Sequence, residues 1–359
     1  MRSLPAAFFL ACSWFWCIGG FLPILLDQEF GKIAFPFFMF FNVVGAALFG
    51  FVWDEAARAR FLSRFLMPAQ FFSVLVVGYH LVFMGWISTL LQSPVPLVGF
   101  ICVTAFFHGL RRQLAGAAVG VFVLTVVLFA MALNAPLPAA GPDIAEVQPF
   151  SHQVLPLALG FLLAPYFDLT FHRAFAESTN PRLGFLVGFG VLFAALLAGV
   201  WLATPVLAQL LTARSFSGEG LQAVVAILVL QTGFTTAAHL REVSRTRWFR
   251  ARRAVPVVAV VTVLVGLHLA VWLSMPAMLF PAGELVYRGF VFLIGVLFPV
   301  FLLFGGVNRY AIMVMAFLTP CYTLGFLIGG AYAPFLSVAV AGLVVLFWIR
   351  PQAALHHPQ

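Results

Sequence analysis

The chain has 359 residues, of which 63% are hydrophobic and only 8% are charged. Soluble domains carry about 25% charged residues, so this chain lacks the polar surface that a soluble globular protein needs. The formal net charge of +8 does not indicate nucleic acid, because the arginines lie in short loops between apolar segments, where basic residues set membrane topology. The composition predicts a membrane protein that has the lipid bilayer as a partner and binds no nucleic acid.

Apolar segments near twenty residues in length follow one another from the first residues to the last. Each can cross a ~30 Å hydrocarbon core as a helix, and none shows the alternation of apolar and polar residues that barrel strands need. The first segment continues past Cys12 to Leu26, which is typical of a retained span rather than a cleaved leader. We predict an all-α membrane protein with about twelve transmembrane helices, at 5–26, 33–53, 65–91, 94–110, 114–134, 150–172, 183–211, 220–240, 254–274, 285–306, 310–329 and 332–349.

The basic residues give these spans an orientation. If the N-terminus is cytoplasmic, all of the 19 Lys and Arg residues except Lys32, Arg214 and Arg288 fall in cytoplasmic segments. Such a bias is the positive-inside rule. It predicts a protein integral to the cytoplasmic (inner) membrane with both termini in the cytoplasm.

Two spans carry residues that interrupt helices. Span 1 contains "WCIGGFLP", with Gly19, Gly20 and Pro23, and span 6 contains "LLAPYFDLTFHRAF", with Pro165 and Asp168. Either feature alone is typical of a simple kink. However, spans 1 and 6 are the first members of two successive groups of five, and paired interrupted helices at matching places in inverted repeats mark the binding sites of transporters.

Span 8 adds a cluster of hydroxyl groups. The stretch "LVLQTGFTTAAHL" places Thr232, Thr235 and Thr236 within about one helical turn. Hydroxyl oxygens are suitable ligands for an alkali cation, although threonines in membrane helices often bond to their own backbone. The four cysteines are Cys12, Cys17, Cys102 and Cys321, and no CxxC pair indicates a zinc site or a disulfide framework.

The stretch "PYFDLTFHRAFAESTNPRLGFLVGF" (165–189) resembles the region from span 6 to span 7 of the solute:sodium symporter family. That family belongs to the amino acid/polyamine/organocation transporter superfamily and has the leucine-transporter-type fold. His172 stands where the family has Gln, and Glu177 where it has a basic residue. The residues that carry the resemblance are Tyr166, Asp168, the pair His172–Arg173, Ala176–Glu177–Ser178 and Arg182.

The resemblance implies a fold of two inverted five-helix repeats within a single transmembrane domain, 1–359. Repeat one would span 1–137 and repeat two 149–306, followed by two extra helices in 307–350. In this fold a sodium ion is held by span 8 hydroxyls and by carbonyls at the unwound point of span 1. The implied sodium ligands here are Cys17, Gly20, Thr232, Thr235 and Thr236; we expect no other cofactor.

The substrate site should lie where the two interruptions meet. We expect it to include Trp16, Gly19 and Gly20 from span 1 and Tyr166, Asp168 and His172 from span 6. Charged groups within spans usually face a cavity or a partner, so Asp168 is interpreted as a counter-charge for a cationic group, a proton carrier or a gate paired with Arg173. A structural ion pair near the cytoplasmic interface is the alternative.

These features favour a secondary active transporter that couples a small organic solute to sodium, and not an enzyme. Three alternatives stay open. Gly50, Asp54 and Arg58 match the spacing of a major facilitator-type loop, although Glu55 and Ala57 depart from it. A lipid-modifying transferase would need acids, bases or metal ligands together at a membrane face, and the acidic residues are scattered. A transporter-like sensor or subunit would keep the fold without transport. Protein partners, the solute and the direction of transport are not indicated.

Overall fold

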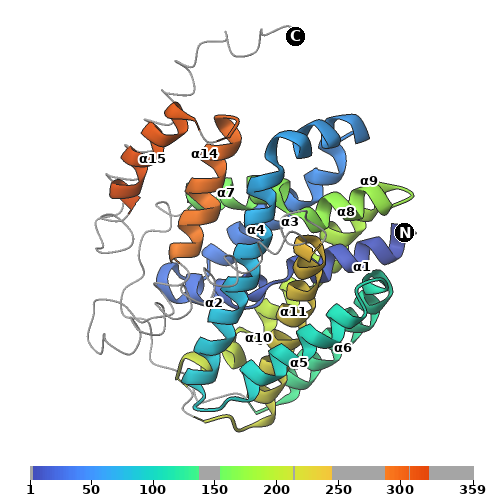
Figure 1. Ribbon diagram of the computed structural model, residues 1–359. Helices are drawn as coiled ribbons and strands as arrows, with labels where there is room; N and C mark the ends of the chain where they lie inside the picture. Colours follow the sequence, from blue (N-terminus) through green and yellow to red (C-terminus); the bar gives the residue numbers. More distant parts are fainter. Residues whose placement is uncertain (1–2, 137–153, 213–214, 245–287, 307, 323–359) are drawn as a thin grey trace, which may run out of the picture. The chain divides into compact units, whose positions relative to one another are not determined.

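A computed structural model of the chain describes residues 3–136, 154–212, 215–244, 288–306 and 308–322, which are helical and contain no strand (Figure 1). The chain separates into two compact units. One comprises Met1–Gln148 with Pro165–Met278, and the other Pro149–Ala164 with Leu279–Gln359. The division at Ala164 and Pro165 falls inside predicted span 6.

The larger unit begins with a bent pair of helices, α1 (Ser3–Trp14) and α2 (Cys17–Phe30), whose axes differ by 49°. They are followed by α3 (Ala34–Val52) and the long α4 (Glu55–Leu90). Asp54 caps α4, since its carboxylate accepts from the backbone N–H of Ala57 at 2.6 Å. The helix is kinked at Phe65, three residues before Pro68, whose ring crowds the preceding turn. The predicted loop before span 3 is therefore helical.

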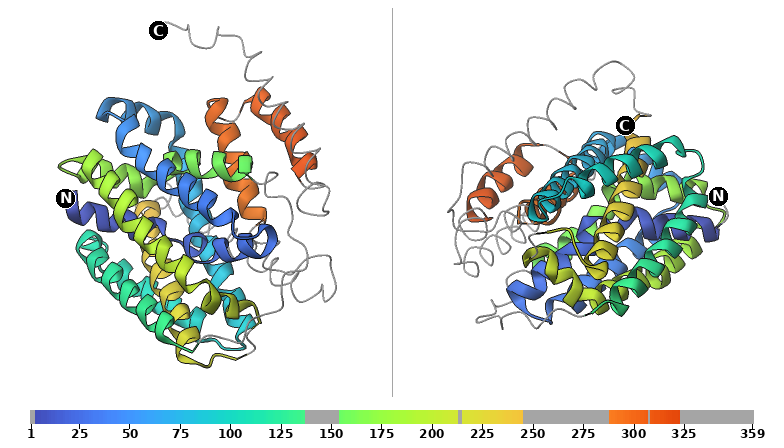
Figure 2. Two further views of the ribbon diagram at one scale, coloured as in Figure 1. Left: turned by 180° about the vertical axis from the view of Figure 1, so that it is seen from behind. Right: turned by 90° about the horizontal axis from the view of Figure 1, so that it is seen from below.

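The other helices of this unit pack around α11 (Glu219–Ser244), which lies beside α5, α6 and α10 in Figures 1 and 2. In the most apolar stretch of α11, 83% of the residues are buried, whereas the corresponding share for α6 is 28%. Predicted span 8 is therefore the central helix of the unit. The surrounding elements are α5 (Val95–Gly109), α6 (Leu114–Asn134), α8 (Leu169–Glu177), α9 (Pro181–Val187), the π-helical turn η3 (Gly188–Phe193) and α10 (Ala194–Thr212).

The smaller unit packs α7 (Val154–Leu163) against the π-helical turn η5 (Leu293–Leu297) and α14 (Phe298–Leu303), which in turn contacts α15 (Arg309–Tyr322). Gly160 permits this packing, because a Cβ there would come within 3.0 Å of the Ile294 side chain. The Tyr322 hydroxyl donates to the Arg288 carbonyl at 2.8 Å.

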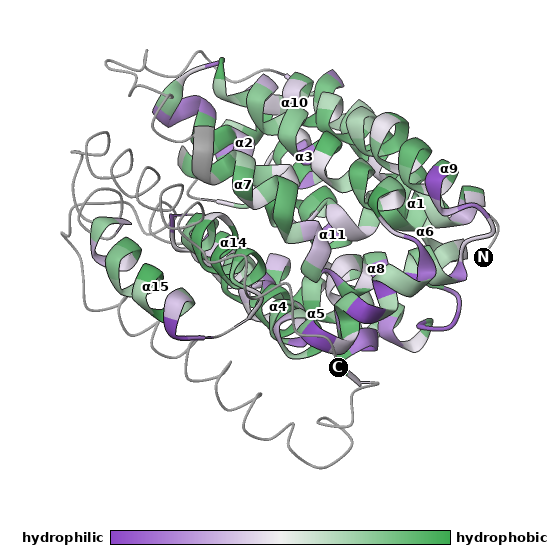
Figure 3. Ribbon diagram, turned by 90° about the horizontal axis from the view of Figure 1, so that it is seen from above, coloured by the Kyte–Doolittle hydropathy of each residue, from purple (hydrophilic) through white to green (hydrophobic). Residues whose placement is uncertain are grey.

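Within the described residues, five helices are long and apolar enough to cross a bilayer, or six if α1 and α2 form one broken span. Large apolar side chains such as Val123, Leu124 and Val127 of α6 are exposed. Figure 3 shows apolar residues along most of each helix and hydrophilic residues around helix ends such as the turn between α8 and α9. Exposed apolar side chains along whole helices indicate that lipid rather than water surrounds them. The chain is a membrane-embedded protein.

The helix boundaries agree closely with some predicted spans, whereas α4 begins ten residues before span 3. Helix α3 covers 34–52 against the predicted 33–53, and α6 covers 114–134 as predicted. Spans 9 and 12 lie outside the described residues. The count of about twelve, the inverted repeats and the single transmembrane domain therefore stay predictions.

Two contacts in the larger unit join segments that the positive-inside rule predicts to lie on the same side of the membrane. Ser3 and Thr179, both predicted on the cytoplasmic side, join through their hydroxyls at 3.0 Å. At the opposite predicted side, the rings of Phe35 and Trp201 lie 4.5 Å apart between centroids.

Candidate functional site: two helix interruptions and a buried acid–histidine pair

The first interruption separates α1 from α2 at Phe15 and Trp16. The last carbonyls of a helix lack partners within it, and here two of them are satisfied by side chains. The Thr235 hydroxyl of α11 donates to the Cys12 carbonyl at 3.0 Å, and the Trp16 indole N–H donates to the Ser13 carbonyl at 2.9 Å. Span 8 therefore contacts the unwound end of span 1.

The glycine pair lies beyond this interruption. Gly19 and Gly20 are helical residues of α2, and Pro23 lies within the same helix without ending it. The prediction that the glycines form the break is therefore wrong by a few residues. A Cβ on Gly20 would come within 2.9 Å of the Leu228 side chain and 3.3 Å of the Phe15 ring. Gly20 provides close packing against α11 rather than an unwound backbone.

The second interruption lies where it was predicted. Pro165 belongs to a short 3-10 turn, η2 (Ala164–Phe167), and Asp168 is extended before α8 begins. One carboxylate oxygen of Asp168, Oδ1, accepts from the Thr170 backbone N–H at 2.7 Å and so caps α8. The other oxygen, Oδ2, is buried and has no hydrogen-bond partner among the described residues.

The two interruptions lie side by side in the larger unit. Helix α8 packs against α1, and the ring of Trp14, the last residue of α1, is 4.9 Å from that of Phe171 in the first turn of α8. The Trp16 ring lies 5.9 Å from the ring of His239 and 6.0 Å from that of His80. Buried polar groups from α4 and α11 therefore gather where both helices are broken.

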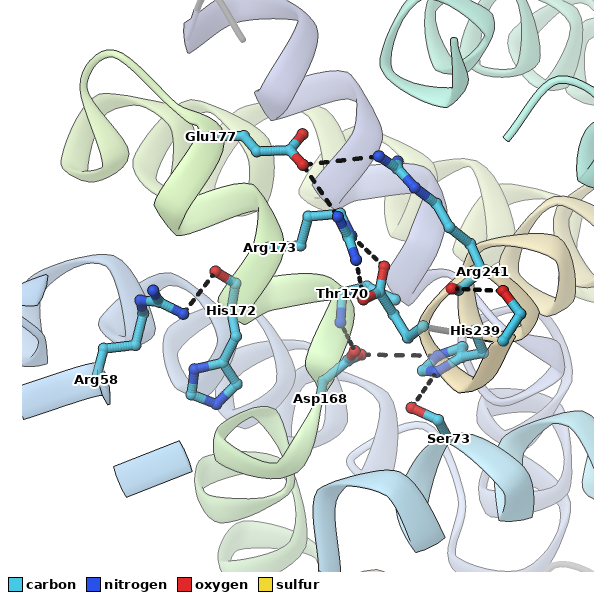
Figure 4. A network of polar contacts seen from close by, with 11 residues as sticks. Arg58, Ser73, Asp168, Thr170, His172, Arg173, Glu177, His239 and Arg241 are labelled. Atoms are coloured by element: carbon cyan, nitrogen blue, oxygen red, sulfur yellow. Dashed lines mark hydrogen bonds and ion pairs between the residues drawn. The ribbon is translucent and has the colours of Figure 1, made fainter. Parts of the chain in front are cut away.

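The Asp168 carboxylate faces His239 of α11 (Figure 4). Oδ2 lies 3.8 Å from His239 Nε2, and both side chains are fully buried. The other ring nitrogen, Nδ1, is 3.1 Å from the Ser73 hydroxyl of α4. Sequence reasoning did not assign His239 to the site. Its position one helical turn after Thr235 was the available signal.

The three threonines of span 8 have different partners. The Thr235 hydroxyl reaches Cys12, and that of Thr236 lies 2.8 Å from His80 Nδ1. Thr232 donates to the Leu228 carbonyl of its own helix at 2.6 Å, which is the common behaviour of threonine in membrane helices. The structure thus directs two of the three predicted hydroxyl ligands toward neighbouring helices.

The span 1 carbonyls that were predicted to bind sodium, those of Cys17 and Gly20, are also placed differently from the prediction. Cys17 is buried in the first turn of α2, and the Gly20 N–H closes a helical turn on the Trp16 carbonyl at 3.3 Å. The carbonyl that span 8 contacts is that of Cys12. Among the described residues, no three His, Cys, Asp or Glu side chains converge as metal ligands.

Tyr166 and His172 lie apart from the acid–histidine pair. His172 Nε2 bonds to the Tyr166 carbonyl at 2.9 Å, and its ring stacks on Phe61 at 5.6 Å. In Figure 4 the His172 ring points away from His239. Tyr166 contacts the rings of Phe49 and Trp53. These two predicted substrate residues belong to an aromatic cluster beside the site.

Arg173 does not pair with Asp168, so one interpretation of that carboxylate is wrong. Its guanidinium binds Glu242 of α11 and lies 3.1 Å from Glu177, which is 3.6 Å from Arg241 (Figure 4). These four residues, the α8–α11 ion-pair network, connect the two helices next to the site. Arg173 has nearer acidic partners and does not supply the counter-charge of Asp168.

Arg58 of α4 attaches a third helix to the same end of the unit. It donates to the His172 carbonyl at 3.3 Å and to the Glu55 carboxylate. The Arg58 hydrogen bond holds the pKa of the exposed Glu55 carboxyl below its usual value. Helix α4 is therefore attached to α8 by a side-chain to backbone contact.

No model of a known protein family matches this sequence, and neither does any curated protein.

Proposed function

We propose that this protein is a secondary active transporter that moves a small organic solute across the cytoplasmic membrane by alternating access, coupled to a cation. The observation that carries the proposal is the meeting of two interrupted helices, α1–α2 and η2–α8, around buried polar groups. Non-helical backbone at membrane depth is tolerated where protein or a water-filled cavity satisfies it. Such paired interruptions are typical of transporter binding sites.

The geometry also supports the resemblance to solute:sodium symporters. The contact between Thr235 and the Cys12 carbonyl connects span 8 to the broken end of span 1, where that family would bind sodium. The α8–α11 ion-pair network would close the cytoplasmic side of the site. A cation that binds one arrangement of these helices more tightly than the other would shift their populations and so couple ion to solute.

The other candidate functions have less support. Gly50 packs against Phe185, and Asp54 caps α4, so both residues have local roles that do not require a major facilitator-type loop. A lipid-modifying transferase would place its reactive groups at a membrane face, whereas Asp168 and His239 are fully buried. A transporter-like sensor or subunit is distinguished only by whether solute moves.

The test is solute flux through the full-length protein in liposomes. A mixture of small organic solutes is offered under an inward sodium gradient or an inward proton gradient, and the accumulated solutes are identified by mass spectrometry. We expect one class of solute to accumulate above the level in empty liposomes. Thr235→Ala with Thr236→Ala should abolish sodium-driven uptake and sodium-induced thermal stabilisation, because both hydroxyls that face neighbouring helices are removed.

The matched control is Thr89→Ala, since that hydroxyl only donates to the Gly85 carbonyl of its own helix. It should keep uptake at the wild-type level. If no solute accumulates under either gradient, transport is wrong and the sensor or subunit becomes the better interpretation. If uptake persists with full sodium dependence in the double variant, the threonine site is wrong.

A further inference from the structure

Asp168 and His239 have one unused polar atom each, and the two atoms face each other. Oδ2 of Asp168 and Nε2 of His239 are 3.8 Å apart, and neither has a hydrogen-bond partner among the described residues. Burying a charged or polar group without a partner is costly. A carboxylate and an imidazole in this position reduce that cost if a proton lies between them.

The contact with Ser73 allows two arrangements of the pair, which differ by one proton. If the Ser73 hydroxyl donates to Nδ1, then Nε2 carries the hydrogen and points it at the carboxylate. If Nδ1 donates to Ser73, then Nε2 is bare and faces an oxygen that must itself be protonated to avoid repulsion. Both arrangements place one proton between Oδ2 and Nε2. The first arrangement holds a carboxylate and the second a neutral carboxyl, so the pair gains one proton in passing from the first to the second.

Among the described residues, no Lys or Arg forms an ion pair with Asp168. The nearest guanidinium on the same helix, Arg173, is bound to Glu242 and Glu177. His80 of α4 is directed to Thr236. Helices α1 and α2 bring the thiols of Cys12 and Cys17 and the carboxyl groups of Asp27 and Glu29, and no basic side chain. The titratable and charged groups on the elements packed around the pair are Cys12, Cys17, Asp27, Glu29, Glu55, Arg58, Arg60, Arg64, Tyr79, His80, Cys102, His108, His172, Arg173, Glu177, Arg182, Glu219, Arg241 and Glu242.

We infer that Asp168 and His239 form a proton-binding site of the transport cycle, one that takes up a proton from the solution on one side of the membrane and releases it on the other. The site lies at the interruption before α8, so movement of α8 against α11 would separate the two side chains. The bond that breaks on release is the O–H of the Asp168 carboxyl. The proton goes to water, and the carboxylate left behind can accept from Nε2–H of His239. This inference rests on the proposed function.

Infrared difference spectroscopy tests the site without any solute. The full-length protein in detergent is titrated between pH ~4 and ~9, the range in which carboxyl and imidazole groups ordinarily change charge. The C=O stretch of a protonated carboxyl is separate from the carboxylate bands. We expect one buried carboxyl band that disappears in Asp168→Asn, and a shifted titration midpoint for that band in His239→Gln. Asparagine keeps the helix cap, so α8 should stay intact.

Glu219→Gln and His108→Gln are the matched controls, because Glu219 is exposed and the buried Nδ1 of His108 has no hydrogen-bond partner among the described residues. Both should reproduce the wild-type band. Asp168→Glu provides a second variant, in which the band should move rather than vanish. A wild-type spectrum in Asp168→Asn overturns the proton site, and an unshifted midpoint in His239→Gln overturns the pair. If the band behaves as expected while no solute moves in liposomes, the proposed function fails and with it the transport role of the pair, whereas proton binding by Asp168 and His239 stands.

Discussion

Asp168 performs two tasks with its two oxygens. Oδ1 caps α8 through the Thr170 N–H, and Oδ2 faces His239. The cap needs only a hydrogen-bond acceptor, which asparagine also provides, whereas the contact with His239 depends on charge. The structural and the proton-binding tasks of this residue can therefore be separated by a single substitution.

At Gly50, close packing decides which residue is tolerated. A Cβ there would lie 2.5 Å from the Phe185 Cβ, which is near the backbone of α9 and cannot turn away. Gly50→Ala should therefore lower the free energy of unfolding by about 1–3 kcal/mol, the usual cost of overpacking. The measurement is thermal unfolding in detergent.

Gly120 of α6 gives the comparison for this experiment, since a Cβ added there has no atom within 4 Å. Gly120→Ala should leave the melting temperature unchanged or raise it, because alanine favours helix. Equal melting temperatures for the two alanine variants would contradict the packing of α3 on α9.

Only some of the residues that form the site could be predicted from the sequence. Asp168 was identified because a charge in an apolar span is conspicuous. His239 was not, because its partner is distant in the sequence and only the fold brings α8 to α11. Tyr166 and His172 were expected at the site from their span, but a helix places neighbouring residues on different faces. Sequence spacing thus indicated the element and not the direction of each side chain.

At the scale of elements, the position of one helix interruption could be predicted from the sequence and the position of the other could not. Proline removes a backbone hydrogen bond, so the break at Pro165 was predicted at the right residue. The break in span 1 precedes the glycines, and Gly20 instead admits the Leu228 side chain of α11, a long-range contact that no local pattern contains. Helix bounds such as those of α6 follow from the length of the apolar segment and could be predicted closely.

The α8–α11 ion-pair network should hold the site closed. Removing one partner of a buried ion pair leaves the other charge uncompensated, which costs roughly 3–5 kcal/mol. Arg173→Gln should therefore loosen α8 and increase the rate at which a thiol reagent reaches Cys12 and Cys17, both buried in the wild type. Labelling is measured after Cys102→Ser and Cys321→Ser.

The double variant Arg173→Gln with Glu242→Gln is the control, because it removes both charges of the pair. It should return the labelling rate toward that of the parent protein. If the single and double variants label at the same rate, the ion pair does not restrain the site.

At the scale of the whole molecule, the predicted orientation rests on charge, and contacts show only which segments lie together. The hydroxyls of Ser3 and Thr179 meet, and both residues lie in segments that the positive-inside rule assigns to the cytoplasm. The order of apolar segments was readable from the sequence because each span carries its own signal. The division into two units was not, because it depends on which helices pack together.

Cysteine accessibility tests this orientation. Ser63→Cys and Thr179→Cys place a thiol at exposed positions on the predicted cytoplasmic side, and Ser217→Cys places one at an exposed position on the opposite side. With Cys102→Ser and Cys321→Ser as background, a membrane-impermeant maleimide should label only Ser217→Cys in intact cells. In inside-out vesicles it should label only the other two. The physical reason is that Arg58, Arg60 and Arg64 would have to cross the bilayer if the orientation were reversed. Labelling of Thr179→Cys and Ser217→Cys from the same side would show that the segment from α9 to α10 does not span the membrane, and the alternation of sides on which the inverted repeats depend would then be wrong.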